Sequence, residues 1–410
     1  MKIWILSHYG LSPKYYTKAR TYNFGRCLTE KGHDVTIFTA STIHHTDKNL
    51  VKEGEQYVTE QVDGINYVYV RTPNYKGNGL KRMINMCAYY LGVKSIWKKF
   101  EKPDVILAMS VHLLTCVAGI QIAKKVKCRC VVQIADLWPL TLIEFGKLKE
   151  NDLLAKLLYK LEYWVYKNAD DVIFTMEGGK EYIKDNKWDK KISDSKIHYI
   201  NNGIVLADFE KQKENNILND EHLDDENLFK VVYTGTIGQA NALEYLVGAA
   251  EIAKERNIDN MVFLIWGDGP KKEEFEKYCV EKQLTNVFFK GKVGKEWIPN
   301  IIERGNANLL LGHPFKMYKY GMSMNKIFDY LAAGRPVVSN IVCGYDMFEK
   351  YQCGITVKET NEDAVLNALV DFYNMDKEKY RSYCVNAKCA SKEFDFSILT
   401  DKLEKILKKR

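Results

Sequence analysis

Short apolar runs of strand length recur along the chain, and stretches in which apolar residues recur at helical spacing separate them. In the first half the apolar runs lie at residues 3–6, 34–39, 104–108, 130–135 and 171–175, and helices are predicted between them, one over residues 21–32. In the second half the apolar runs lie within residues 230–238, 261–270 and 286–294, and a helix is predicted over 242–253. Strands that alternate with helices are joined by right-handed crossovers into parallel sheets. The pattern therefore predicts an α/β protein.

Each of the three strands in the second half runs into a glycine-rich turn. The candidate residues are Gly235, Thr236 and Gly238 in the first turn, Gly267 and Asp268 in the second, and Lys292 and Val293 in the third. Glycine lets backbone N–H groups approach an anion closely, although many α/β proteins use such a turn only for packing. Because parallel strands end at one edge of their sheet, the three turns are expected at the edge where ligands bind.

Residues 320–338 predict a loop, a helix and a buried strand, with polar residues gathered where the helix begins. Ser323 is predicted as the N-cap, after which backbone N–H groups point outward and attract an anion together with the ammonium of Lys326. Asp329 lies about one turn further along the same face, where a carboxylate accepts both hydroxyls of a ribose. Gly334 is predicted to end the helix. This segment therefore predicts nucleotide binding, and the alternative is an ordinary amphipathic helix with a solvated lysine.

Length and composition favour two domains. A chain of 410 residues is longer than one hydrophobic core usually supports, and its hydrophobic share of 46% is that of a globular protein. The predicted domains cover residues 1–206 and 207–395, and the polar region 210–227 is predicted as the linker. No apolar run approaches the ~20 residues needed to span a membrane. The ten cysteines form no CxxC pair, which predicts free thiols in a reducing cytoplasm and no metal site.

Positive charge is concentrated in the first half of the chain. Residues 1–206 contain 31 Lys and Arg against 21 Asp and Glu. Within this half, residues 80–100 combine a helical pattern of Met, Tyr, Leu, Ile and Trp with five basic residues. That composition is typical of a helix on an anionic leaflet, and equally of a core helix with solvated lysines at its ends. Nucleic acid explains the charge less well, because no binding module is recognisable.

Several motifs of the chain resemble glycosyltransferase family 4. They lie at residues 233–238, 266–270, 290–293 and 323–336, and the resemblance continues upstream in residues 169–176 and 200–204. It covers essentially the whole chain, in order and at the expected spacing. The branch it resembles most builds capsule, O-antigen and aminosugar polysaccharides.

The resemblance implies a retaining, nucleotide-sugar-dependent enzyme with the GT-B fold, in which two Rossmann-like domains with parallel sheets face each other across a cleft. It also implies that residues 396–410 form a helix that crosses back to the N-terminal domain, which would bind the acceptor. The donor, expected to be a UDP-sugar, would bind the C-terminal domain. The residues implied for the donor are Gly235, Thr236, Gly238, Gly267, Asp268, Lys292, Val293, Ser323, Asn325, Lys326 and Asp329.

Two departures from the family pattern concern the donor site. The family commonly carries two glutamates eight positions apart around the nucleotide helix, and here these positions are Gly321 and Asp329. Many members also place an Arg and a Lys after the first glycine turn, whereas residues 236–242 contain no basic residue. Lys326 is therefore expected to neutralise more of the diphosphate charge.

The catalytic and acceptor residues are expected at strand ends of the first half. Asp136 follows a buried strand and precedes Trp138, and relatives carry the same Asp-Leu-Trp-Pro segment at their cleft. Asp136 is predicted to accept or orient the proton of the acceptor hydroxyl, and the alternative is an Asx-turn. His8 is a weaker candidate base. Tyr9, in the same first loop, and Trp138 are expected on the acceptor side, and Arg20 matches a basic position that relatives keep at a phosphate.

The expected activity is retaining transfer of a sugar to a saccharide or lipid-linked acceptor, with catalytic roles for Asp136, Lys326 and His8. No cofactor and no metal are expected, because glycine-turn amides, a helix N-terminus and Lys326 stabilise the leaving diphosphate.

The expected location is the cytoplasm, with a peripheral contact at the inner face of the cytoplasmic membrane. The alternatives are a UDP-sugar 2-epimerase-like enzyme and a non-catalytic glycosyltransferase-like partner protein. A dinucleotide-dependent oxidoreductase is disfavoured, since no G-x-G-x-x-G follows the first strand.

Overall fold

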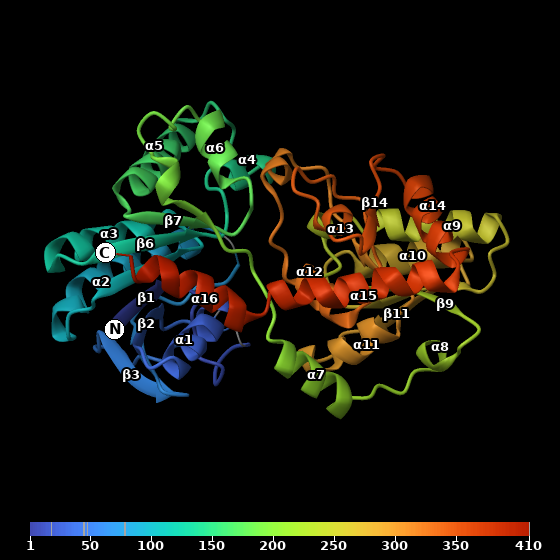
Figure 1. The fold of residues 1–410 in the computed structure, drawn as a ribbon, viewed down its shortest axis with the longest axis horizontal. Helices are drawn as coiled ribbons and strands as arrows, with labels where there is room; N and C mark the ends of the chain where they lie inside the picture. The colour runs from blue at the N-terminus through green and yellow to red at the C-terminus, as the bar shows by residue number, and fades with distance from the viewer. Residues whose placement is uncertain (18, 44–45, 47, 78, 410) are drawn as a thin grey trace. The chain divides into compact units, whose positions relative to one another are not determined.

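The computed structural model describes residues 1–409 apart from residues 18, 44–45, 47 and 78, and it forms two compact units (Figure 1). Unit 1 consists of Met1–Asn201 and Phe396–Arg410, and unit 2 consists of Asn202–Asp395. Both units are α/β, as predicted.

Unit 1 is built on one eight-stranded sheet with the order β3-β4-β2-β1-β5-β6-β7-β8. The strands are β1 (Lys2–Ser7), β2 (Asp34–Ala40), β3 (Tyr57–Val62), β4 (Ile65–Val70), β5 (Val105–Ser110), β6 (Arg129–Ile134), β7 (Asp171–Phe174) and β8 (Ile197–Tyr199). Strands β1, β5 and β6 are almost fully buried apolar runs, because helices cover both faces of a parallel sheet.

Seven α-helices surround this sheet in the described part of unit 1. They are α1 (Arg20–Glu30), α2 (Leu80–Ile96), α3 (Leu113–Val126), α4 (Leu140–Glu144), α5 (Leu153–Asn168), α6 (Gly179–Asp185) and α16 (Phe396–Leu407). Helix α3 packs against both α2 and α5, and α1 packs against α16. Helix α16 is held to unit 1 by Glu404, whose Oε1 lies 2.8 Å from Nε2 of His33. Arg129 Nη1 also donates to the carbonyl oxygen of Ile406 at 3.1 Å.

The sheet of unit 1 is not wholly parallel, which corrects the sequence prediction. Strand β3 pairs antiparallel with β4 at the edge of the sheet, through the turn at Asp63 and Gly64. Three of the six residues of β3 are exposed, because it is an edge strand with one face open. Its sequence, YVTEQV, lacks the continuous apolar run by which the other strands were predicted.

Unit 2 contains a six-stranded parallel sheet with the order β11-β10-β9-β12-β13-β14. The strands are β9 (Phe229–Thr234), β10 (Met261–Trp266), β11 (Val287–Gly291), β12 (Ala307–Leu310), β13 (Val337–Ser339) and β14 (Gly354–Thr356). Its α-helices are α7 (Leu206–Asn215), α8 (Glu221–Asp224), α9 (Glu244–Glu255), α10 (Lys272–Glu281), α11 (Ile298–Arg304), α12 (Asn325–Ala333), α13 (Met347–Lys350), α14 (Glu362–Tyr373) and α15 (Lys377–Glu393). Numbered from β9, this is the 3-2-1-4-5-6 order of a Rossmann fold.

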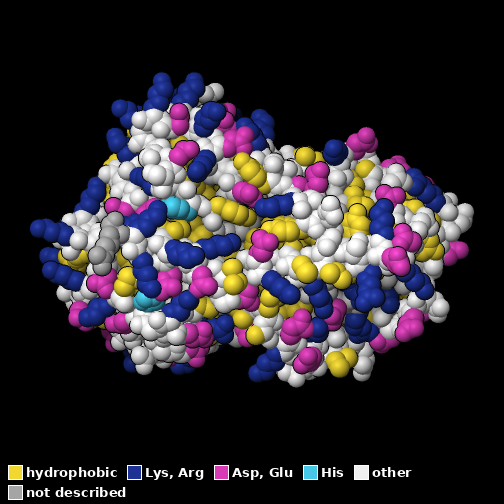
Figure 2. All heavy atoms as spheres, in the orientation of Figure 1, with side chains coloured by type: hydrophobic (Ala, Val, Ile, Leu, Met, Phe, Trp, Pro, Cys, Tyr) yellow, Lys and Arg dark blue, Asp and Glu magenta, His cyan; other side chains and the backbone are white. Residues whose placement is uncertain are grey.

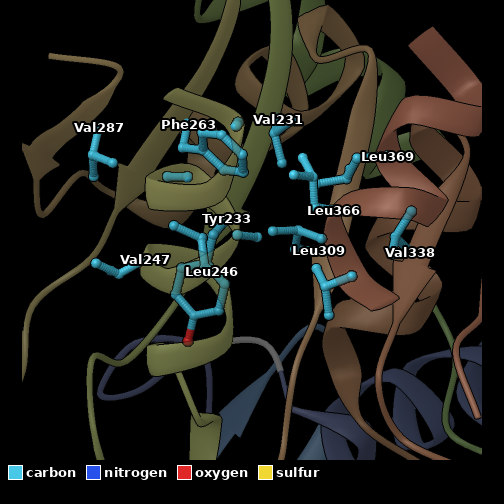
Figure 3. Close-up of a cluster of buried hydrophobic side chains, with 14 of the residues drawn as sticks. Val231, Tyr233, Leu246, Val247, Phe263, Val287, Leu309, Val338, Leu366 and Leu369 are labelled. Carbon is cyan, nitrogen blue, oxygen red and sulfur yellow. The ribbon is translucent and has the colours of Figure 1, made fainter. Parts of the chain in front are cut away.

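Successive residues of β9 serve two separate cores on the two faces of this sheet. Val231 and Tyr233 pack with Leu246 of α9 and Leu366 of α14 on one face (Figure 3). Val232, between them, packs on the other face with the cluster that contains α11 and α12. Because side chains alternate along a strand, one apolar run holds helices on both sides.

The polar region 210–227 is not the linker, and the predicted boundary after residue 206 also differs from the observed one after Asn201. Much of this region belongs to α7 and α8 of unit 2. Each helix is anchored by a buried aromatic or aliphatic residue, Phe209 in α7 and Leu223 in α8. A surface helix that needs few apolar contacts has a composition much like that of a linker, so composition alone does not distinguish them.

None of the helices in the described part of the chain is long and apolar enough to cross a membrane.

Candidate functional site

In the unit 2 sheet, the strands after β9 are added on one side up to β11, and those from β12 onward are added on the other side of β9. The order of the strands therefore reverses between β9 and β12. In open α/β sheets, ligands bind outside the carboxyl ends of the strands at such a switch point. The segments that follow β9, β10 and β12 therefore define the candidate donor site.

The three glycine turns dock against one another at this edge. The N–H of Gly235 donates to the carbonyl of Trp266 at 2.9 Å, and the N–H of Gly267 donates to the carbonyl of Gly291 at 2.9 Å. Between them, the N–H of Ile237 donates to the carbonyl of Asp268 at 2.9 Å. A Cβ atom on Gly267 would overlap the carbonyl oxygen of Gly235. Glycine is therefore required here for close approach of backbone to backbone.

Helix α12 begins at Asn325 rather than directly after Ser323, so the predicted Ser323 N-cap is wrong. The N-cap residue is Met324, and it makes no side-chain cap hydrogen bond. The hydroxyl of Ser323 instead accepts a hydrogen bond from the N–H of Asn202 at 3.2 Å, and the Asn202 side chain donates to that of Asn325. No N-cap side chain therefore satisfies the first N–H groups of α12, and such groups bind anions.

Lys326 extends from the first turn of α12 to the first glycine turn. Its Nζ lies 3.1 Å from the hydroxyl of Tyr233 and 3.3 Å from Oδ1 of Asn241. It also lies 4.2 Å from the centre of the Tyr233 ring. Burial lowers the pKa of Lys326 to about 8, so the ammonium still predominates at neutral pH. A positive charge thus reaches the glycine turn although residues 236–242 contain none.

The close approach of Lys326 depends on Gly235. This glycine has φ +139°, and a Cβ atom built on it would overlap the Cε and Nζ atoms of Lys326. The glycine therefore allows an unusual backbone conformation and leaves room for the ammonium.

Asp329 lies one helical turn beyond Lys326 and is half-buried. Burial raises the pKa of its carboxyl to about 7, and the positive charge of Lys295 opposes the rise. Among the residues that the structure describes, no hydrogen bond or ion pair to the Asp329 carboxylate is found. Its oxygens are therefore available to a ligand.

The other predicted donor residues lie around the same edge with different degrees of exposure. Thr236 is exposed, and its carbonyl accepts a hydrogen bond from Tyr233 at 2.7 Å, while Gly238 is buried. Asp268 is exposed and accepts from the N–H of Gly269 at 2.8 Å. Lys292 is exposed, whereas Val293 packs against the apolar cluster that includes α12.

His313 and Glu244 lie close together at the same edge, a contact that the sequence motifs did not predict. His313 follows β12, and its Nε2 lies 3.5 Å from Oε1 of Glu244 in the first turn of α9. Glu244 is three residues beyond Asn241, the residue that contacts Lys326.

The corresponding edge of unit 1 contains a buried pair of histidines, one of which the sequence did not reveal. His8 follows β1 and His112 follows β5, and Nδ1 of His8 lies 2.9 Å from Nε2 of His112. Both are almost fully buried. Burial and the nearby charge of Arg82 lower the pKa of His112 to about 3, so this imidazole is neutral at physiological pH. The signal for His112 was its place just after a buried strand, the same signal that identified Asp136.

Asp136 lies at the same edge, two residues beyond the end of β6. The turn there is closed by the carbonyl oxygen of Asp136, which accepts from the N–H of Trp138 at 3.1 Å. Within the described ranges, no hydrogen bond to the Asp136 side chain is found, so the Asx-turn alternative is not supported. Burial raises the pKa of the Asp136 carboxyl, and the guanidinium of Arg82 opposes this.

Arg82 is a second residue of this edge that the sequence did not single out. It extends from the first turn of α2, and its Nε donates to the hydroxyl of Tyr9 at 2.8 Å. It influences the pKa of both His112 and Asp136, so the three side chains are close in space. The sequence pattern did not distinguish Arg82 from the neighbouring basic residues, which are typical of a solvated helix end.

Arg20 contacts protein atoms at three of its nitrogens. Its Nε donates to Oε1 of Gln133 at 3.0 Å, Nη2 donates to the carbonyl of Ile200 at 2.8 Å, and Nη1 donates to the carbonyl of Asn201. These bonds join α1 to β6 and to the segment after β8. The observed role of Arg20 is to hold these segments together, and its role at a phosphate stays a prediction.

Two family models match consecutive parts of this chain. Residues 18–208 match the model described as Glycosyltransferase Family 4, and residues 229–375 match the model described as Glycosyl transferases group 1. A curated relative, named as a colanic acid biosynthesis glycosyl transferase, WcaI, of Escherichia coli (strain K12), is 23% identical over 300 residues. This match covers 69% of this chain and 70% of the relative.

Solved structures share the fold over the full length of the chain. One is described as trehalose-6-phosphate from E. coli bound with UDP-2-fluoro glucose, with a TM-score of 0.76, 11% identity and complete coverage of both chains. Another is HepE of Anabaena in complex with UDP and glucose, with a TM-score of 0.64, 14% identity and complete coverage of both chains. At these identities the likeness establishes the fold alone.

Proposed function

Because the chain belongs to glycosyltransferase family 4 and has the GT-B fold, we propose that it transfers a sugar from a UDP-sugar to a saccharide acceptor with retention of configuration. The curated relative carries a polysaccharide biosynthesis name, and two structures that share the fold contain UDP or a UDP-sugar analogue. These descriptions support a UDP-sugar donor and a role in building a surface polysaccharide.

The observation that carries this proposal is the position of Lys326. Its ammonium lies against the first glycine turn, at a helix N-terminus without a side-chain cap, and Asp329 follows one turn later. A diphosphate needs positive charge and N–H donors, and a ribose needs a hydrogen-bond acceptor. The proposed roles are diphosphate binding by Lys326 and the N–H groups of α12, and ribose binding by Asp329.

The chemistry requires charge stabilisation on the departing diphosphate. Lys326 and the backbone N–H groups supply it where the charge develops, which is the arrangement that lowers a barrier. No metal is part of this proposal. Asp136 of unit 1 is assigned to the acceptor hydroxyl and takes its proton, while the hydroxyl oxygen forms the new bond to the sugar carbon and the bond from that carbon to the diphosphate oxygen breaks. The proposed course is front-face attack assisted by the leaving phosphate, since no carboxylate here is a convincing nucleophile for a double displacement.

A nucleotide-sugar panel tests the proposal. Thermal unfolding with UDP, GDP and their sugars should show stabilisation by the uridine compounds, because a ligand that binds the folded state adds RT ln(1 + [L]/Kd). Incubation with the stabilising UDP-sugar, with and without a chelator, should release UDP in both cases. Epimerised donor as the product would instead establish the epimerase alternative, and binding without turnover would establish the non-catalytic one.

Removing the Asp329 carboxylate should weaken UDP binding. Asp329→Ala is expected to cost roughly 1–3 kcal/mol of binding free energy, because the ribose hydroxyls lose a charged acceptor. Isothermal titration with UDP measures this. The matched control is Asp371→Ala, an exposed carboxylate on α14. Equal UDP affinity in wild type and Asp329→Ala, with unfolding temperatures alike, would remove Asp329 from the site.

We also propose that α2 brings unit 1 to an anionic leaflet, as a lipid-linked acceptor would require. One face of α2 buries Met86, Tyr89 and Val93 in unit 1, while the opposite face exposes Leu80 (71%) and Leu91 (62%). Residues 80–99 contain no Asp or Glu. The helix therefore combines a core face with an apolar outer face, and its charges are all positive.

Vesicle binding tests the contact of α2. Lys98 and Lys99 lie just beyond the C-terminal end of α2. Lys98→Gln with Lys99→Gln should weaken binding to anionic vesicles by roughly 2 kcal/mol, at about 1 kcal/mol for each lysine. Lys377→Gln with Lys379→Gln on α15 changes the net charge equally and should have no effect. Wild-type binding should also fall with salt, because the Debye length shrinks from about 10 Å at 0.1 M to about 3 Å at 1 M. Equal binding to neutral and anionic vesicles would contradict the proposal.

A further inference from the structure

Two polar side chains meet where the strand order of the unit 2 sheet reverses, beside the residues proposed to bind the nucleotide. Glu244 lies in the first turn of α9, which follows β9, and His313 follows β12. Nε2 of His313 lies 3.5 Å from Oε1 of Glu244. Because β9 and β12 flank the switch point, a pair that joins the segments after these strands lies where open α/β sheets bind ligands.

The pair is close to Lys326, the residue proposed to bind the diphosphate. Nζ of Lys326 lies 3.3 Å from Oδ1 of Asn241, and Glu244 is three residues beyond Asn241, where α9 begins. Asp329, proposed for the ribose, lies instead one turn into α12. In a nucleotide-sugar the diphosphate connects the ribose to the sugar. The sugar is therefore expected on the side of Lys326 where α9 begins.

The chemistry of Glu244 suits a sugar better than a phosphate. A carboxylate repels a diphosphate, whereas it accepts charge-assisted hydrogen bonds from hydroxyl groups. Within the part of the chain that the structure describes, the contact with His313 is the one polar contact found for the Glu244 side chain, which is 42% exposed. Its second oxygen, Oε2, is therefore available to a ligand. The loop with His313 is fixed by Asn340, whose Oδ1 accepts from the N–H of Gly312 at 2.9 Å.

Charge alone does not distinguish this pair from the others of unit 2. Figure 2 shows acidic and basic side chains interspersed over the visible face of this unit, and an exposed ion pair contributes little to stability. Glu244 also complements the dipole at the N-terminus of α9, which is a role in stability alone. What distinguishes the pair is its place at the switch point, and affinity for the sugar part of a donor separates the two roles.

We propose that Glu244, oriented by His313, determines which sugar the donor carries, because its carboxylate accepts hydrogen bonds from the hydroxyl groups of that sugar. The donor class that fits is a UDP-sugar without an acidic group on the sugar ring. The carboxylate of a uronic acid would meet Glu244 with like charge, and such repulsion rejects a wrong ligand. This inference rests on the proposed function, since it assigns the sugar part of the same donor site.

Isothermal titration with UDP, UDP-glucose, UDP-N-acetylglucosamine and UDP-glucuronate tests the role of Glu244, because these probes differ only beyond the diphosphate. The wild-type protein should bind the better of the two neutral UDP-sugars more tightly than UDP-glucuronate. Glu244→Gln should weaken that neutral UDP-sugar about ten-fold, since a charged acceptor becomes a neutral one. The same variant should bind UDP-glucuronate more tightly than wild type does. Its affinity for UDP should be unchanged, because UDP carries no sugar beyond the diphosphate.

Two further variants complete the test. His313→Gln should weaken the neutral UDP-sugar about three-fold, because Glu244 keeps its charge but loses its fixed orientation. Glu255→Gln is the matched control, since Glu255 is an exposed carboxylate at the other end of α9, and it should leave every affinity as in wild type. Thermal unfolding checks that each variant is folded.

Two results would overturn this inference and leave the proposed function standing. One is equal affinity of Glu244→Gln and wild type for the neutral UDP-sugars and for UDP-glucuronate, with UDP bound by both proteins. The other is a parallel loss of affinity for UDP and the UDP-sugars in Glu244→Gln, which would assign Glu244 to the diphosphate or to folding. Failure of the wild-type protein to bind UDP would instead refute the proposed function.

Discussion

Replacing Asp136 with Asn should lower turnover about 10²–10⁴-fold, the range for loss of a positioned proton acceptor. The substitution keeps the size of the side chain but removes its negative charge and basicity. Asp136 has the features of such a group, since it follows the buried strand β6 and its turn is closed by its backbone carbonyl. Burial raises its pKa, which makes the carboxylate a better proton acceptor than an exposed aspartate. Initial rates with saturating UDP-sugar and a saccharide acceptor measure the effect.

The control for this prediction is that donor binding survives. Asp136 lies in unit 1 and the proposed UDP-sugar site lies in unit 2, so the UDP affinity of Asp136→Asn should equal that of wild type. Asp189→Asn, at an exposed loop position of unit 1, should leave both turnover and UDP affinity unchanged. A lowered unfolding temperature together with near-normal turnover would assign Asp136 a structural role.

Residues directly after apolar strands were the predictable part of both sites. A buried strand is a strong signal, and in a parallel sheet its carboxyl end must lie at the ligand edge. That rule placed the three glycine turns and Asp136 without any knowledge of side-chain contacts. It applied equally to His112, which follows β5, but a single histidine after a strand carried no chemical pattern of its own.

Contacts between distant segments were the unpredictable part. Ser323 has the composition of an N-cap, yet its hydroxyl accepts from Asn202, which is far away in sequence. The basic residue that the first glycine turn lacks is supplied from α12 by Lys326, through space. In the sequence, Arg82 could not be distinguished from the solvated basic residues around it, and only the fold shows that it contacts Tyr9. Local propensity predicts elements, whereas these partners are decided by tertiary packing.

Edge and surface elements were missed for a different reason. Strand β3 and helices α7 and α8 bury few residues, so their sequences lack the periodic apolar pattern on which prediction depends. Each is stabilised by a few contacts to an existing core, such as Phe209 of α7. Conversely, the leucines of α5 are apolar and yet exposed. Only the structure distinguishes them from core residues.

Replacing Lys326 with Gln should lower turnover about 10²–10³-fold, as expected when a donor to the developing charge is lost. The Lys326 ammonium also gives the site a characteristic pH dependence. With a pKa of about 8, it loses its proton as the pH rises through that value, and UDP-sugar affinity should fall above it. Asp329, with a pKa of about 7, gains a proton as the pH falls through that value, and affinity should fall below it. UDP-sugar affinity should therefore be highest between about pH 7 and pH 8.

Variants separate the two limbs of this profile. Lys326→Gln should abolish the alkaline fall and Asp329→Asn the acid fall, because each removes the group that titrates. Gly235→Ala keeps the lysine but places a methyl group where its Nζ lies, so affinity should fall as in Lys326→Gln although the ammonium is still present. Lys277→Gln, on the exposed surface of α10, should reproduce the wild-type profile. Titration with a UDP-sugar is preferable to UDP, whose terminal phosphate itself ionises near this range. An unchanged alkaline limb in Lys326→Gln would show that another group binds the diphosphate.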